Sequence, residues 1–308
     1  PVPWFTVQAI IDRELDVHPD EAFASIEKKP LGTASLAQAH AAVLADGTAV
    51  VIKVLHPGVL EGLETDLMAL RALLAGGRLV GRRDAELTAI RREVEERLRE
   101  ELDYLTEAAN LEAFSQVFAG DPRVVMPRPY VELCTRQVLV MDHVPGLPLQ
   151  EFLAVATPQA RQRAGLTLAE LFFEMTFVHR MLHADPHPGN VLFQEDGTVG
   201  LVDFGCVKRF DEFFLGRYAR AVLAAYDGDR AETLEAARDL GVWVGDTPEA
   251  GEAVWRFCDV ALAPWREGSC VLGKDEHLLT RCRDAAQELW KYPEVAGVAD
   301  MIYLHRTL

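Results

Sequence analysis

The spacing of hydrophobic and polar residues changes along this chain, from strand-like runs to a helical spacing, and this change divides the chain into two parts. In the first part, an apolar-rich run at 36–44 and a β-branched run at 48–55 are joined through Asp46-Gly47. Two strand-like runs that meet at an Asp-Gly pair are a strong β-hairpin signal. Residues 123–141 hold two further strand-like runs. This part is therefore predicted to be rich in β-strands.

Apolar residues spaced by three and four predict helices elsewhere in the chain. The longest such pattern runs from 84 to 118, and a broad apolar face at 158–181 predicts a largely buried helix. Short helical patterns at 7–18 and 20–26 precede the strands. Everything after 205 reads as helix, with breaks predicted at Gly228, Gly241–Gly245 and Pro264–Gly268.

A segment rich in proline and glycine, HVPGLP at 143–148, is the best candidate for a boundary between the two parts. We therefore predict a helical lead-in at 1–24, a β-rich region with one long helix at 25–142, and a helical region at 143–308. The predicted fold class is α+β, with a small β-rich N-lobe and a helical C-lobe.

Charge and cysteine content narrow the class of protein. With 31 basic and 48 acidic residues among 308, the net charge is -17, which argues against a nucleic-acid binder because such proteins need clustered cations. Five scattered cysteines without a C-x-x-C pair predict free thiols in a cytoplasmic compartment. No apolar run approaches the roughly 18 residues of a membrane span, although peripheral membrane contact stays open. The start at Pro1 and the interrupted apolar end suggest a fragment.

The segment at 183–205, HADPHPGNVLFQEDGTVGLVDFG, carries the candidate chemistry. Asp185 is followed five residues later by Asn190 and thirteen residues after that by Asp203. Two short apolar runs between Asn190 and Asp203 are joined by Glu195-Asp196-Gly197, which predicts a hairpin.

This order of side chains suits phosphoryl transfer from ATP. That reaction needs an oriented nucleophile and neutralised phosphate charge, usually through Mg²⁺. Because Mg²⁺ prefers hard oxygen ligands, Asn190 and Asp203 are its predicted ligands, while Asp185 is placed to accept a hydroxyl proton. A His-x-Asp loop, an asparagine and an Asp-Phe-Gly in this order match the protein-kinase template. The expected fold is therefore protein-kinase-like, with two lobes.

Lys53 lies within the β-branched run at 48–55, where a cation is costly to bury unless it is paired. In the kinase template, a strand lysine contacts the phosphates and is held by a glutamate from a helix. Candidate partners lie in EELDYLTEAANL at 100–111. There Asp103 and Glu107 share a helix face, while Glu101 points elsewhere around the axis.

The segment KPLGTASLAQAH at 29–40 precedes the lysine, in the position of a loop that covers phosphates. It contains Gly32, Thr33, Ala34 and Ser35. Backbone N–H groups and hydroxyls can contact phosphates, but the alanines restrict the backbone. From the residues alone, an ordinary turn is an equal alternative.

These segments together resemble the UbiB-type atypical kinase family, the AarF-domain kinases that include coenzyme Q-linked kinase-like ATPases. The resemblance covers roughly residues 5–308. The motifs that carry it are GTASLAQAH, VIKVLHPGV, ELDYLTEAANL, HADPHPGN and VDFG.

The resemblance implies a role for each matching residue. Lys53 is implied to contact phosphate, with Glu107 as its ion-pair partner, while Asp185 is the catalytic-loop aspartate and Asn190 and Asp203 are the metal ligands. The implied nucleotide-contacting residues are Gly32, Thr33, Ala34, Ser35, Lys53, Met141 and His143. Glu101 and Asp103 match the acids of the family's E-x-D motif.

This sequence departs from the pattern in three places. The family's Lys-x-Gly-Gln motif, in an N-terminal extension, does not occur here. His187 stands where many protein kinases carry a lysine. No Ala-Pro-Glu segment follows Asp203, which argues against conventional recognition of peptide substrates.

The resemblance implies an ATP- and Mg²⁺-dependent phosphotransferase or ATPase that supports the biosynthesis of prenylquinone lipids, with a prenylated lipid or quinone precursor as partner. A small-molecule kinase of the aminoglycoside or choline kinase type is an alternative, since HADPHPGN suits it nearly as well. A nucleotide-gated scaffold without catalysis is a third.

Overall fold

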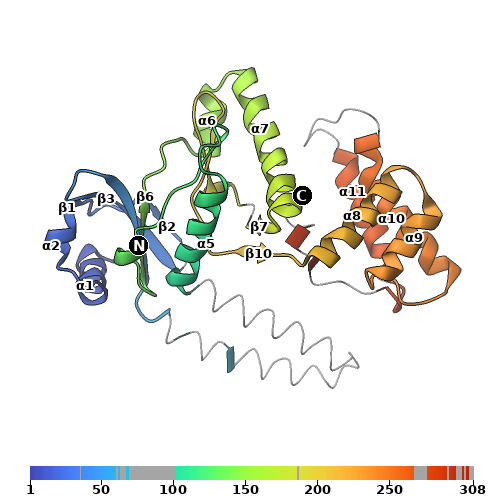
Figure 1. Ribbon diagram of the computed structural model, residues 1–308, viewed down its shortest axis with the longest axis horizontal. Coiled ribbons are helices and arrows are strands. Elements are labelled where there is room, and N and C mark those ends of the chain that lie inside the picture. Colours follow the sequence, from blue (N-terminus) through green and yellow to red (C-terminus); the bar gives the residue numbers. More distant parts are fainter. Residues whose placement is uncertain are drawn as a thin grey trace. The chain divides into compact units, whose positions relative to one another are not determined.

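The computed structural model contains two compact units (Figure 1). The first unit comprises Pro1–Phe172 and Asp185–Val207, and the second comprises Phe173–Ala184 and Lys208–Leu308. The structure describes residues 1–34, 36–59, 62, 67–68, 102–185, 187–266, 276–289, 291–295, 300–301 and 303–304.

An antiparallel sheet forms the N-terminal part of the first unit (Figure 1). Its strands are β1 (Phe23–Ile26), β2 (Gly32–Thr33), β3 (Ala37–Leu44), β4 (Ala49–Leu55) and β6 (Val138–Asp142). The strand order is β1-β3-β4-β6, and β2 also pairs with β3. The β3–β4 hairpin predicted at Asp46-Gly47 is confirmed. Gly47 has a φ of 91°, a left-handed conformation that glycine adopts without a steric penalty.

The two faces of this sheet have different roles. One face packs against helix α1 (Trp4–Glu14) in a hydrophobic core. That core includes Val7, Ile10, Ile11, Val50, Ile52, Val54, Val138 and Val140. Each such side chain contributes about 1.5–3 kcal/mol on burial, so this face anchors the sheet. Because side chains alternate along a strand, Lys53 projects from the opposite face of β4.

Helix α5 (Tyr104–Val117) follows the sheet's central strands in the chain and begins later than the predicted helix at 84–118. Asp103 caps its N-terminus, because the Asp103 side chain accepts a hydrogen bond from Leu105 N at 3.1 Å. Asp103 therefore precedes the helix instead of sharing a helical face with Glu107. Residues 84–101 of the predicted helix, including Glu101, lie outside the described residues.

A second, three-stranded sheet holds the hairpin predicted after Asn190, which is confirmed. β8 (Val191–Phe193) and β9 (Val199–Leu201) are antiparallel, and β5 (Val124–Val125) pairs with β9 in parallel. Gly197 in the turn has a φ of 93°, and a Cβ there would lie 2.6 Å from the Ala160 carbonyl oxygen. The turn thus packs tightly on helix α7 (Pro158–Phe173). The first unit also contains η2 (Val131–Leu133), α6 (Leu149–Val155) and η4 (Pro188–Asn190).

The second unit is largely helical. It contains η3 (Glu174–Val178, a π-helical turn), β7 (Met181–His183), α8 (Glu212–Tyr226), α9 (Arg230–Asp239), α10 (Pro248–Arg266) and α11 (Glu276–Leu289). Strand β10 (Val207–Arg209), which pairs with β7, begins at the last residue of the first unit. Helix ends fall at or beside the predicted breaks at Gly228 and Gly241–Gly245, whereas α10 continues through Pro264, and residues 267–268 of the third predicted break lie outside the described residues. The sheet-rich N-terminal region and the helical C-terminal part confirm the α+β class, while the division at 143 stays a prediction.

Three further predicted helices differ from the structure, the first being the pattern at 7–18, where α1 already ends at Glu14. The pattern at 20–26 divides into α2 (Pro19–Ala22) and strand β1, because backbone pairing with β3 overrides the local helical spacing. The helix predicted at 158–181 ends its regular part at Phe173 and leads through the π-helical turn into β7.

Within the described ranges, no helix is both long and apolar enough to span a bilayer. Cys134 and Cys258 are free thiols.

Candidate nucleotide and metal site

Two acidic side chains from separate parts of the first unit meet at Lys53. Its Nζ donates to Glu107 Oε1 at 2.7 Å and to Asp203 Oδ2 at 3.1 Å. The Lys53 and Glu107 side chains are 13% and 5% exposed, whereas that of Asp203 is 40% exposed. The cluster therefore has a buried end at Glu107 and an accessible end at Asp203.

The neighbouring carboxylates favour the charged form of Lys53 despite its burial. Desolvation opposes the charge of Lys53, but the Glu107 and Asp203 carboxylates outweigh it and raise the lysine pKa. For Glu107, burial is the largest influence and raises its pKa, with Lys53 acting in the opposite direction and Asp203 in the same direction. With both acids ionised, two carboxylates face one ammonium. The remaining negative charge suits a divalent cation at the exposed end.

Strand register places Lys53 beside the alanine-rich segment. Gly32 pairs with Ala39, Ala39 pairs with Lys53, and Lys53 pairs with Leu139. Directly opposed residues share a sheet face, so Ala39 lies on the lysine side. Along β3, the alternate residues Gln38, His40, Ala42 and Leu44 are buried toward the other face. Small residues therefore line the face from which Lys53 projects.

The alanine-rich loop is a short hairpin between β2 and β3. Gly32 and Thr33 form β2, and Ala34 N donates to the Ala37 carbonyl oxygen at 2.8 Å. Gly32, Thr33 and Ala34 are all exposed, so their backbone is accessible to a ligand. Ser35 lies outside the described residues.

Met141 and His143 lie at the end of β6 and just beyond it. Met141 is buried and pairs with Val51, which lies two residues before Lys53 and so on the same sheet face. His143 is exposed, and its backbone N donates to the Ala49 carbonyl oxygen at 3.1 Å. The structure thus places Met141 on the lysine side of the sheet and His143 at the surface.

Asp185 and Asn190 form a second pair in the loop before β8. Asn190 Nδ2 donates to Asp185 Oδ2 at 2.7 Å. Val202 N also donates to the Asn190 carbonyl oxygen at 3.1 Å, which continues the β8–β9 ladder by one step. Asn190 therefore lies across the ladder from Val202, the residue before Asp203. The hairpin brings the two predicted metal ligands to one end of the sheet.

His187 lies at the start of the short helix that ends at Asn190. It is exposed, and its Nδ1 accepts a hydrogen bond from Gly189 N at 3.0 Å. This contact stabilises the start of the short helix η4, which ends at Asn190. The role of His187 here is to shape the loop that holds Asn190.

Asn110 was not predicted from the sequence, although the structure places it at the Asp-Phe-Gly segment. Its Nδ2 donates to the Phe204 carbonyl oxygen at 3.1 Å. Glu107 Oε1 accepts from Phe204 N at 3.2 Å, in addition to its bond with Lys53. Glu107 and Asn110 are three residues apart and therefore share a face of α5. That spacing within EAANL was the available signal.

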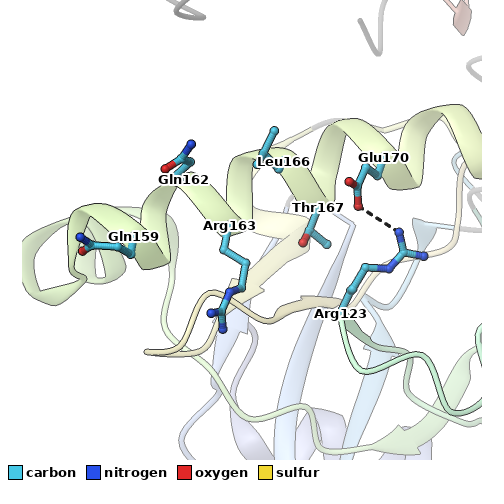
Figure 2. A pocket seen from close by; sticks show the side chains of 7 residues that line it. All are labelled: Arg123, Gln159, Gln162, Arg163, Leu166, Thr167 and Glu170. Atoms are coloured by element: carbon cyan, nitrogen blue, oxygen red, sulfur yellow. Dashed lines mark hydrogen bonds and ion pairs between the residues drawn. The ribbon is translucent and has the colours of Figure 1, made fainter.

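A shallow surface depression of about 370 Å³ lies elsewhere, along α7 (Figure 2). Figure 2 shows Arg123 directed toward Glu170, with an ion-pair distance of 3.0 Å. Arg123 also pairs with Asp121 at 2.6 Å. Arg123 is thus paired with two acids, and none of the residues around Lys53 lines the depression. We assign the candidate site to the Lys53 cluster instead.

A strand lysine paired with a helix glutamate and with the aspartate of an Asp-Phe-Gly defines a protein-kinase-like domain. Residues 1–237 match the ABC1 atypical kinase-like domain. The chain therefore belongs to the ABC1 atypical kinase-like family, which confirms the resemblance to UbiB-type kinases.

Curated relatives support this assignment. The chain is 33% identical over 248 residues to "Atypical kinase COQ8B, mitochondrial" of Rattus norvegicus, covering 79% of this chain and 46% of that protein. It is 33% identical over 265 residues to "Probable protein kinase UbiB" of Azotobacter vinelandii, covering 82% and 48%. The chain thus spans about half the length of these relatives.

A solved structure shows a similar fold. Rv3197 of Mycobacterium tuberculosis, solved as an erythromycin complex, has a TM-score of 0.72 and 25% sequence identity to this chain. The match covers 94% of this chain and 78% of that one. It extends across the sheet-rich N-terminal region and the helical C-terminal part.

Proposed function

We propose that this chain binds ATP with Mg²⁺ and uses it for phosphoryl transfer or hydrolysis. The observation that carries the proposal is the contact of Lys53 with both Glu107 and Asp203. Burying a lysine with two acids costs desolvation free energy that their pairing offsets, and a strand lysine of this kind holds phosphates in kinases. Membership of an atypical kinase family supports the same function.

The residues present fit a magnesium–nucleotide complex. Asp203 offers a carboxylate that is 40% exposed, and Asn190 offers an amide oxygen that its bond to Asp185 does not use. Mg²⁺ is commonly bound by one or two such oxygens together with phosphate oxygens and water. The metal would neutralise charge on the transferred phosphate. Lys53 would orient the phosphates, with the β2–β3 hairpin above them.

Asp185 is the proposed acceptor of the proton from the attacking hydroxyl or water. Its Oδ2 accepts a hydrogen bond from Asn190, which fixes the carboxylate next to a proposed metal ligand. General-base catalysis of this kind contributes about 10²–10⁴-fold to a rate. Asp185 and Asn190 would therefore act together, at the end of the β8–β9 hairpin where Asp203 follows Val202.

We further propose a prenylated lipid or quinone precursor as the acceptor or regulatory partner, in a cytoplasmic setting with peripheral membrane contact. The family assignment supports this substrate class. The test is ATP turnover measured with prenylphenols in detergent micelles and, in parallel, with amino alcohols. Stimulation by prenylphenols is expected. Stimulation by amino alcohols alone would instead favour a small-molecule kinase, and no turnover under any condition would favour a scaffold.

Replacing Ala34 by glycine is expected to change nucleotide selectivity. The substitution removes the methyl group that restricts the backbone at the exposed tip of the β2–β3 hairpin. A glycine in place of alanine changes local backbone free energy by about 0.5–1 kcal/mol, so the ratio of ATP to ADP affinity should shift about two- to fivefold. Calorimetric titration with each nucleotide measures that ratio. An unchanged ratio would show that the hairpin lies away from the phosphates.

A further inference from the structure

The peptide group between Phe204 and Gly205 is held at both of its polar ends. Its carbonyl oxygen accepts from Asn110 Nδ2 at 3.1 Å, and its N–H donates to Asp203 Oδ1 at 3.1 Å. Because a peptide group is planar and rigid, these two bonds are not independent. A rotation that breaks the bond to Asn110 also withdraws the N–H from Asp203.

Helix α5 holds the same segment by two further contacts. Glu107 Oε1 accepts from Phe204 N at 3.2 Å, so α5 bonds both the N–H and the carbonyl group of Phe204. The Phe204 ring is fully buried, with its centroid 5.1 Å from that of Phe114 on α5. Backbone and side chain are therefore both fixed to one rigid helix. The bond from Asn110 to the Phe204 carbonyl oxygen and the bond from Gly205 N to the Asp203 carboxylate both depend on the direction of the Phe204–Gly205 peptide.

We infer that Asn110 is a positioning residue that orients the Asp203 carboxylate toward the metal through the Phe204–Gly205 peptide. Hydrogen bonds in series polarise one another, so donation by Asn110 strengthens donation by Gly205 N to Oδ1. With Oδ1 held, the Asp203 carboxylate keeps Oδ2 directed toward Lys53, where the phosphates would lie. This inference rests on the proposed function, because it assigns Asp203 to Mg²⁺.

The test compares Asn110→Ala and Asn110→Leu with the wild-type protein. Leucine keeps nearly the same shape and removes the donor, which covers the case that the alanine variant fails to fold. Glu112→Gln, an exposed change on the same helix, is the matched control. The first measurement is hydrogen exchange of the Gly205 amide in metal-free protein, by NMR. The second is the Mg²⁺ concentration that gives half-maximal ATP binding.

Both Asn110 variants should exchange the Gly205 amide faster and need about tenfold more Mg²⁺, since lost outer-shell partners weaken metal binding by about 10- to 100-fold. ATP binding without Mg²⁺ should not change. A merely structural role would lower thermal stability without moving the Mg²⁺ midpoint. Folded variants with wild-type exchange and midpoint would overturn the role of Asn110 alone. A wild-type protein that binds no ATP with Mg²⁺ would overturn the proposed function as well.

Discussion

Replacement of Asp203 by asparagine is expected to abolish magnesium-dependent nucleotide binding. The substitution keeps the shape of the side chain and removes the charge at the accessible end of the Lys53 cluster. Even partners outside the metal's ligand shell weaken binding by about 10- to 100-fold when lost, so a ligand should cost at least about 100-fold. ATP titrations at several Mg²⁺ concentrations measure the effect.

Asp196→Asn is the matched control for this change. Asp196 lies in the turn of the same hairpin, at the opposite end from Asp203, and its Oδ1 accepts from Thr198 N at 2.9 Å. Asparagine suits such turns, so that variant should bind Mg²⁺ and ATP like the wild-type protein. If Asp203→Asn also keeps wild-type Mg²⁺ dependence, Asp203 is not a metal ligand.

Replacement of Lys53 by alanine is expected to have two separate effects. Loss of hydrogen bonds from a charged donor to phosphate costs about 1.5–3 kcal/mol, so ATP affinity should fall about 10- to 150-fold. The variant should also be less stable, because Glu107 is left buried without its cation. Lys291→Ala, at an exposed lysine paired with Glu288, is the control.

The stability loss in Lys53→Ala should depend on pH. Lys53 lowers the pKa of Glu107, so its removal lets burial raise that pKa further above the ordinary value of 4.5. When folding raises the pKa of an acid, the folded protein loses stability as pH increases from the ordinary pKa of that acid through its raised pKa. The variant should therefore approach wild-type stability on acidification toward pH 4.5. Chemical denaturation across this range measures the difference, and a loss independent of pH would contradict the ion-pair account.

Local signals in the sequence predicted both hairpins and the chemistry that they carry. Asp46-Gly47 and Asp196-Gly197 each supply the glycine that adopts the left-handed conformation of the turn. A hairpin turn needs this glycine only at the turn itself, so a few neighbouring residues are enough to predict it. Lys53 was identifiable because a lone cation in a β-branched strand needs a partner. Such features depend on neighbouring residues, so they could be derived without the fold.

Other features depend on distant contacts and could not be derived in this way. Strand β1 reads as helix locally and becomes a strand only through pairing with β3. The start of α5 at Tyr104 depends on the cap from Asp103. The contact of Asn110 with Phe204 joins residues 94 positions apart, and no local pattern predicts its direction.

Calorimetric titration of the wild-type protein with ATP, with and without Mg²⁺, tests the shared site of Lys53, Asn190 and Asp203 most directly. We expect saturable binding that strengthens with Mg²⁺. A parallel unfolding measurement should show about 2.7 kcal/mol of added stability at a hundredfold excess of ATP over its dissociation constant. An ATP affinity that is the same with and without Mg²⁺, or no binding of ATP at all, would contradict a metal–nucleotide site at these residues.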